Sequence, residues 1–164
     1  MRTMTAGTPA EPKDLRPLDT TDLALVRLLA ADGRMTNQAL AEAVGIAPST
    51  CLGRVRSLVD RGVIRGFHAD VAPEALGHTL QAVIAVRLQP SARASIPAFS
   101  ARMATIPGVL NVFFLAGADD FLLHVVAAGT QELRDFVVVH LNQSPDVAAT
   151  ETNLIFEHLR GSTL

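Results

Sequence analysis

Apolar residues recur every three or four positions in three consecutive stretches of the N-terminal half, which is typical of amphipathic helices. The stretches predict helices over residues 19–32, 36–45 and 48–62. Thr36 suits the N-cap of the second helix, because its hydroxyl can accept from an exposed amide of the first turn. Pro48 suits the first turn of the third helix, because its φ is fixed. Three helices with a tight turn between the last two predict a helix-turn-helix unit.

The third predicted helix has two chemically different sides. Its apolar stripe is Cys51, Leu52, Val55, Leu58 and Val59. Polar and basic residues are expected on the other side, where they can contact phosphates or base edges of DNA. The expected DNA-binding residues, with one from the start of the second helix, are Thr36, Ser49, Thr50, Arg54 and Arg56. Which arginine reads a base and which holds a phosphate stays open. An apolar strand is predicted next, at 63–71, in the position of a wing.

The second half of the chain alternates between strand-like and helix-like patterns. The predicted elements are a strand at 80–88, a helix at 95–105, strands at 109–115 and 121–127, a helix capped by Thr130 and ended by Ser144-Pro145, and a strand at 147–159. This order, β-α-β-β-α-β, is the ferredoxin-like pattern. Helices on one face of such a sheet leave the other face bare. Val83, Ala85 and Phe114 are expected to be exposed there, which favours association through that face.

These patterns divide the chain and define an α+β fold class. The expected parts are a disordered tail at 1–14, a winged helix-turn-helix DNA-binding domain at 15–66, a linking strand and connector at 67–78, and a ferredoxin-like domain for effector binding and oligomerisation at 79–164. The effector role of the last part rests on the family resemblance given below.

Charge is distributed unevenly between the two halves. The formal net charge of the whole chain is −2, which by itself argues against binding to nucleic acid. Residues 15–66, however, hold seven arginines against five acids, a net +2, and residues 67–164 hold five arginines against nine acids, a net −4. The positive charge is thus concentrated in the helix-turn-helix half, as binding to phosphates requires. Because this charge is modest, several such domains are expected to act together on DNA.

Candidate catalytic and metal-binding residues are sparse. The five histidines show none of the short spacings of a metal site. Asp119 and Asp120 are adjacent on a predicted turn, so their side chains should point apart rather than work as an acid–base pair. Cys51 lies on an apolar stripe and is expected in the core. The sequence therefore predicts no enzyme, metal or cofactor. Without an apolar membrane span or signal sequence, we expect the protein in the cytoplasm.

The chain resembles the leucine-responsive/AsnC-type, or feast/famine, transcriptional regulators over roughly residues 15–160. In the N-terminal half the residues that carry this resemblance are Leu18-Asp19, Leu28-Leu29, Asp32-Gly33-Arg34, Leu40-Ala41, Val44-Gly45, Pro48-Ser49, Cys51, Arg54-Val55, Leu58 and Gly62-Val63-Ile64. The resemblance implies binding to double-stranded DNA, a homodimer that often assembles further to octamers, and a small-molecule effector, in this family a free amino acid.

A turn in the second half resembles the family's Gly-Asp-x-Asp-Tyr effector loop, and two threonines on the last strand resemble its Thr-x-Thr. The effector-binding residues that this implies are Gly117, Asp119, Asp120, Phe121, Thr150 and Thr152. A plain hairpin turn is the alternative interpretation. Three residues depart from the family pattern: Ala118 replaces an acid in the loop, Ala47 replaces a capping serine, and Gly53 replaces a residue that is often basic.

Two functions remain open at this stage. The first is a sequence-specific transcriptional regulator whose assembly or DNA binding responds to a small amino acid or related metabolite. The alternative is an architectural chromosome-binding protein without an effector, which the departure at Ala118 keeps open.

Overall fold

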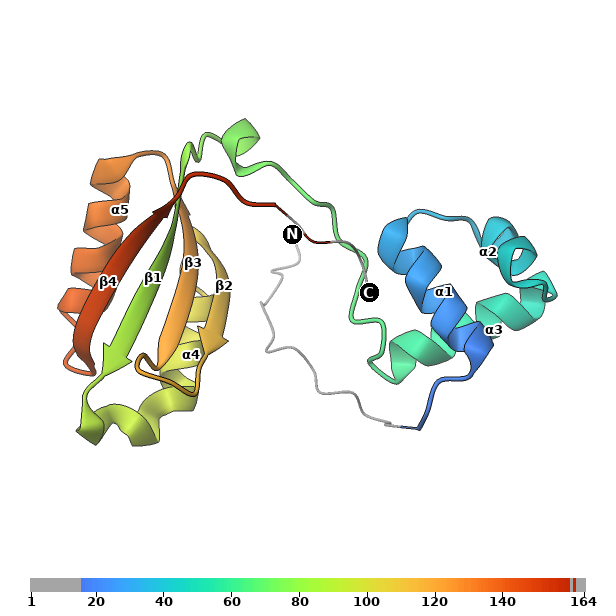
Figure 1. The fold of residues 1–164 in the computed structure, drawn as a ribbon, viewed down its shortest axis with the longest axis horizontal. Coiled ribbons are helices and arrows are strands. Elements are labelled where there is room, and N and C mark those ends of the chain that lie inside the picture. Colours follow the sequence, from blue (N-terminus) through green and yellow to red (C-terminus); the bar gives the residue numbers. More distant parts are fainter. Residues whose placement is uncertain (1–15, 160, 162–164) are drawn as a thin grey trace, which may run out of the picture. The chain divides into compact units, whose positions relative to one another are not determined.

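The computed structural model describes residues 16–159 and 161, which fold as two compact units with the division between Asp70 and Val71. Figure 1 shows the helical N-terminal unit and the C-terminal unit built on a sheet. The tail expected at 1–14 lies outside the described residues. No helix in the described ranges is both long and apolar enough to cross a membrane.

Three helices form the N-terminal unit: α1 spans Thr20–Ala31, α2 spans Asn37–Val44 and α3 spans Pro48–Asp60. Two caps are those the sequence predicts. Asp19 accepts from the amide of Asp22 at the start of α1, and Thr36 accepts from the amide of Ala39 at the start of α2. Gly45 ends α2 in the left-handed conformation, with φ of 69°. The helices pack around the buried side chains of Leu25, Leu29, Leu40, Ala41, Cys51 and Leu58.

The strand predicted at 63–71 is wrong for this chain, because that segment is irregular throughout. Val63 and Ile64 are half-buried and pack against the helical core, and the amide of Ile64 donates to the carbonyl of Leu58 at 3.1 Å. The apolar pattern there reflects this packing. A strand also needs a hydrogen-bonded neighbour, and all four strands in the described part of the chain lie in the sheet of the other unit.

The C-terminal unit is ferredoxin-like, as the sequence predicts. Its elements are a 3-10 turn at Pro73–Leu76, β1 at Leu80–Leu88, a 3-10 turn at Pro90–Ser95, α4 at Ile96–Ala104, β2 at Val109–Phe114, β3 at Phe121–Ala127, α5 at Thr130–Phe136 with a π-helical continuation at Val137–Asn142, and β4 at Val147–Ile155. The strands pair antiparallel in the order β2-β3-β1-β4. Gly129 occupies the N-cap of α5 instead of Thr130, and β4 ends at Ile155, four residues before the predicted end.

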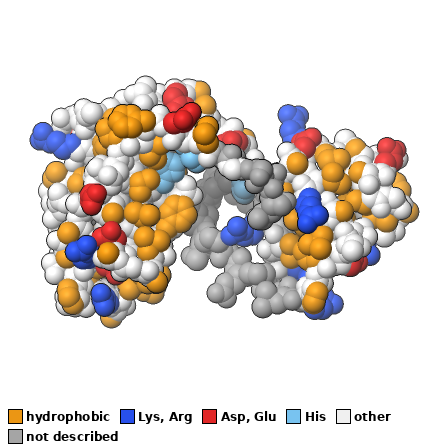
Figure 2. Space-filling view, viewed as in Figure 1, with side chains coloured by type: hydrophobic (Ala, Val, Ile, Leu, Met, Phe, Trp, Pro, Cys, Tyr) orange, Lys and Arg blue, Asp and Glu red, His pale blue; other side chains and the backbone are white. Residues whose placement is uncertain are grey.

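The two α-helices of this unit, α4 and α5, cover the same face of the sheet (Figure 1). Phe99 and Met103 of α4, with Leu133 of α5, pack on the inward residues of β1 and β3. Figure 2 shows hydrophobic side chains, with histidine among them, on the visible side of this unit.

The register assigns residues to the bare face. Val83 lies opposite His124, and Ala85 opposite Leu122, which lies opposite Phe113. Phe113 is 51% exposed, whereas Ala85 is only 7% exposed. Phe114 is exposed as expected, at 59%, but it lies on the wrong face, because it pairs with Phe121 and shares the helix-covered side of the sheet. For Ala85 the expected exposure is wrong.

Candidate nucleic-acid interface and effector loop

The start of α3 is fixed by a side chain of α2 and not by one from the turn. Ala47 has the extended conformation of an N-cap, with φ of −66° and ψ of 143°, and has no side chain that could accept a hydrogen bond there. Instead, Asn37 at the start of α2 donates through its Nδ2 to the carbonyl of Pro48 at 2.8 Å. This bond holds the first turn of α3 against the first turn of α2.

The outward face of α3 is polar and open. Ser49, Thr50, Gly53 and Arg56 are exposed, while Cys51 and Leu58 are fully buried against the other helices. A Cβ added to Gly53 would meet no atom within 4 Å. This side of the helix can therefore approach a flat or grooved partner closely, with Arg56 as a cation on it.

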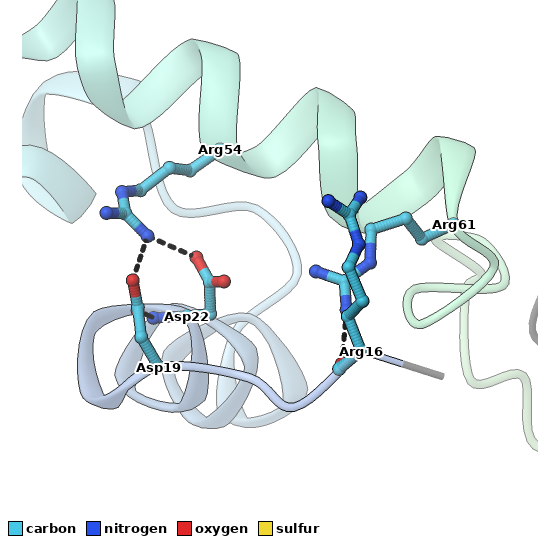
Figure 3. Close-up of polar contacts among 5 residues, drawn as sticks. All are labelled: Arg16, Asp19, Asp22, Arg54 and Arg61. Carbon is cyan, nitrogen blue, oxygen red and sulfur yellow. Dashed lines mark hydrogen bonds and ion pairs between the residues drawn. The ribbon is translucent and has the colours of Figure 1, made fainter. Parts of the chain in front are cut away.

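Arg54 lies on a different flank of α3, in contrast to the expectation that it shares a side with Arg56. Its Nη1 donates to Asp19 Oδ2 at 2.6 Å and to Asp22 Oδ1 at 2.8 Å, both at the start of α1 (Figure 3). The amide of Asp22 and the Arg54 guanidinium together hold the pKa of the Asp19 carboxyl below its ordinary value. The two carboxylates in turn raise the pKa of Arg54.

The loop between β2 and β3 is tied to the end of β1 by its second aspartate. The amide of Asp120 donates to the carbonyl of Val86 at 3.0 Å, and its Oδ2 accepts from the amide of Leu88 at 2.8 Å. Gly117 is exposed, and the structure leaves open space where its Cβ would be. The loop thus presents its tip to solvent while Asp120 anchors its base.

Arg87 is a residue of this loop site that the sequence reasoning missed. Its Nε donates to the carbonyl of Ala118 at 3.0 Å, and its Nη2 bonds Asp119 Oδ1 at 3.3 Å. The pair is open to solvent, with the Arg87 side chain 55% exposed. One signal could have found it: a lone arginine near the end of the apolar run of β1, at a position that alternation turns away from the core.

The remaining expected effector residues lie at the same end of the sheet but do not all face the loop. Phe121 is fully buried, with its ring 4.9 Å from that of Phe99 and 5.3 Å from that of Phe114. In this chain it is a core residue and cannot line the site with its side chain. Thr150 and Thr152 lie on β4, opposite Val86 and Ile84 of β1.

Across β1, Thr150 and the first residue of β3 are two strand spacings apart, about 10 Å. The Thr150 hydroxyl donates to Asn142 Oδ1 at 3.3 Å, on the helix-covered side of the sheet. The Thr150 hydroxyl is therefore engaged on the helix-covered side of the sheet and not at the loop.

A polar cluster around the buried His124 lies on the bare face of the sheet. His124 Nε2 is 3.0 Å from Gln81 Oε1, its Nδ1 is 3.3 Å from Asn111 Nδ2, and the ring of His158 meets it edge-on with centroids 5.8 Å apart. A neutral imidazole protonated on Nε2 satisfies both bonds. Burial, and then the nearby His158, lower the pKa of His124.

Neither metal binding nor nucleophilic chemistry is indicated by the other reactive side chains. Among residues 16–159 and 161, no group of three or more His, Cys, Asp or Glu side chains could hold a metal ion. Cys51 is buried, and burial raises the pKa of its thiol. A thiol in that state is a poor nucleophile.

Both units match models of known families. Residues 18–65 match a winged helix-turn-helix DNA-binding model, and residues 81–163 match the Lrp/AsnC ligand binding domain. The two matches define a class: transcriptional regulators with a DNA-binding unit and a ligand-binding unit. The chain belongs to the Lrp/AsnC family of transcriptional regulators.

Particular relatives agree with this assignment. The chain is 57% identical over 155 residues to the HTH-type transcriptional regulator AldR of Mycobacterium tuberculosis. This alignment covers 93% of this chain and 87% of the relative. The chain is 40% identical over 143 residues to the leucine-responsive regulatory protein of Rhizobium meliloti, over 87% of this chain and 92% of the relative. These are names of regulators and not of enzymes, in agreement with the sequence prediction.

Solved structures show the same architecture. The crystal structure of the M. tuberculosis AldR superposes with a TM-score of 0.76 at 53% identity, and the match covers 90% of this chain and 100% of that one. A transcriptional regulator of Neisseria meningitidis, solved as a complex with L-Met, superposes with a TM-score of 0.80 at 31% identity and covers 90% of this chain and 95% of that one.

Proposed function

We propose that this regulator senses a small amino acid at the loop of residues 117–120, and that the outward face of α3 binds its operator DNA. The observation that carries the effector proposal is the exposed ion pair between Arg87 and Asp119 at the loop tip. A free α-amino acid carries a carboxylate and an ammonium that are both bonded to its α-carbon. It can therefore replace the internal pair, with Arg87 binding the carboxylate and Asp119 the ammonium.

The chemistry of this exchange favours a zwitterion over a simple anion or cation. Either charge alone would leave Arg87 or Asp119 without a counter-ion, whereas an amino acid satisfies both. Charge-assisted bonds contribute about 1.5–3 kcal/mol each, so two of them give micromolar-to-millimolar affinity after the costs of association. The L-Met complex of the Neisseria relative supports this ligand class.

We propose the following DNA-contacting set, with Arg56 as the residue that reads a base: Thr36, Ser49, Thr50 and Arg56. Arginine can bond two acceptors of a guanine at once, which makes such a contact worth about 1–3 kcal/mol of discrimination. Hydroxyls at the start of α3 suit phosphate oxygens.

The bare sheet face, with Phe113 and Val83, supports assembly into at least a dimer and further to a higher oligomer. We also propose that the protein works in the cytoplasm, since its relatives come from bacteria and archaea, whose DNA lies there.

Isothermal calorimetry of the full chain against each common amino acid tests the effector proposal. The expected result is micromolar-to-millimolar binding of one or a few small amino acids, lost in Arg87→Met and Asp119→Asn and unchanged in the matched surface variant Arg93→Met. Asp120→Ala should also lose binding, because Asp120 anchors the loop to Leu88. Binding of none of them, together with broad coating of DNA in genomic mapping, would instead favour an architectural protein without an effector.

A further inference from the structure

Helix geometry separates the two arginines in the middle of α3. Successive residues of an α-helix are about 100° apart around its axis, so Arg54 and Arg56 point about 160° apart. They cannot both face one DNA groove. Arg56 shares its direction with the exposed Ser49 and Gly53, whereas Arg54 extends to the start of α1 and is 34% exposed.

Arg54 is held in place by two partners of different character. Asp22 is largely shielded, with its side chain 13% exposed, and Asp19 is 51% exposed. Asp19 is also the N-cap of α1, because its Oδ1 accepts from the amide of Asp22 at 2.8 Å. The guanidinium therefore bonds directly to the cap of the neighbouring helix, so a shift of α3 along α1 would break both ion pairs.

Arg61 makes a second link along the same flank. It lies seven residues after Arg54, two helical turns and about 10.5 Å further along the axis. Its Nη2 donates to the carbonyl of Arg16 at 2.6 Å, just before α1 (Figure 3). Two links at different heights restrict rotation of α3 relative to α1 more than either link alone.

We propose that Arg54 is a positioning residue for DNA recognition: through Asp19 and Asp22 it fixes the angle at which α3 presents Arg56 and Ser49 to the groove. A direct contact from Arg54 to DNA is disfavoured, because transfer of its charge to a phosphate would leave two carboxylates close to the DNA without a counter-ion. The direction in which its side chain extends leads to the same assignment.

The difference between a phosphate contact and a positioning role can be measured through salt dependence. Each phosphate contact contributes about 0.9 to the slope of log K against log salt, and a positioning residue contributes none. Loss of position instead impairs base contacts, which lowers the preference for the cognate sequence. The probes are a duplex that the wild-type protein selects from a random pool and a scrambled duplex of the same composition.

The experiment uses the full chain with Arg54→Met, which keeps the length of the side chain but removes its charge. The selected duplex should bind about tenfold or more weakly, the loss expected when one base contact is displaced. The ratio of selected to scrambled affinity should fall by the same factor, and the salt slope should not change. In the control variant Arg56→Met, affinity should fall and the salt slope should decrease by about one if Arg56 also neutralises a phosphate, or stay constant if it only reads a base.

The partner residues give an independent arm. Asp19→Asn with Asp22→Asn keeps the N-cap, because asparagine caps as well as aspartate, but removes both counter-ions of Arg54. This double variant should show the same loss of sequence preference, and adding Arg54→Met to it should cause no further loss.

Arg54→Met alone leaves Asp19 and Asp22 without a counter-ion. If that variant does not fold, the salt slope is measured on the triple variant, which combines Arg54→Met with the two Asp-to-Asn changes. Two results would overturn the proposal and make Arg54 a phosphate contact. One is a salt slope reduced by about one in Arg54→Met or in the triple variant. The other is tighter binding of the Asp-to-Asn double variant to both duplexes with its sequence preference intact.

Discussion

Replacement of Gly53 by alanine should stabilise the N-terminal unit by about 0.8–1 kcal/mol, the full difference in helix propensity between the two residues. The surroundings of Gly53 add no steric cost that would reduce this gain in stability. Gly53 lies in the interior of α3, which spans Pro48–Asp60, and it is exposed. A Cβ there meets no atom within 4 Å, so the added methyl group neither clashes nor gains packing.

Gly45 provides a matched control in the same unit. A Cβ on it would also meet nothing within 4 Å, but its φ is +69°, where an L-residue is strained. Gly45→Ala should therefore destabilise by about 1–2 kcal/mol. The two substitutions add the same methyl group in open space and differ only in backbone conformation, so opposite signs are expected.

Thermal unfolding followed by far-UV circular dichroism is a suitable assay, because the chain has no Trp or Tyr whose fluorescence could report on the unit. A change of about 1 kcal/mol in a domain of this size shifts Tm by about 4–8 °C. Hydrogen exchange of peptides from α3 assigns the change to this unit. Equal shifts of the same sign for Gly45→Ala and Gly53→Ala, or a lower Tm for Gly53→Ala, would refute the reasoning.

Two further predictions concern capping and pH. Ala47→Ser should stabilise α3 by about 0.5–2 kcal/mol and Thr36→Ala should destabilise α2 by a similar amount, since a capping hydroxyl is gained in one case and lost in the other; denaturant midpoints that do not move in opposite directions would contradict this. The pKa of His124 in the folded protein lies below the ordinary value of 6.5. The neutral imidazole therefore contributes its full stabilisation above pH 6.5, and this stabilisation is lost as the pH falls through the folded-state pKa. The C-terminal unit should therefore unfold more easily at mildly acidic pH, and His124→Gln should weaken that dependence, leaving His158 as the neighbouring titratable group; an unchanged pH profile in the variant would rule out His124 as the cause.

Helix boundaries in this protein are encoded locally, which is why the sequence predicts them well. Asp19 and Thr36 accept hydrogen bonds from amides three residues further on, and Gly45 needs only its own left-handed φ. Such contacts depend on residue type and spacing within one turn. The same is true of Pro48, which lies in the first turn of α3 as expected, and of Pro97 in the first turn of α4.

Features that depend on distant residues could not be predicted in the same way. Arg54 meets carboxylates 32 and 35 positions away, and no local pattern shows which flank of α3 they occupy. Phe114 was assigned to the wrong face because the register of β2 shifts between Val109 and Asn111. A bulge of this kind reverses the alternation for every later residue of the strand.

The internal bonds of α3 have a consequence for how this family member binds DNA. Residues 15–66 hold seven arginines, and two of them, Arg54 and Arg61, donate to other groups of the same unit. The footprint of one unit on DNA is correspondingly small, so we expect the affinity of one unit to be weak and its dependence on salt to be shallow. When several units are linked, the second binding event becomes intramolecular and the combined affinity rises by about 10²–10⁴ if the geometry permits simultaneous contact. We propose that an effector bound at the 117–120 loop can therefore switch operator binding by changing how subunits assemble, without touching α3.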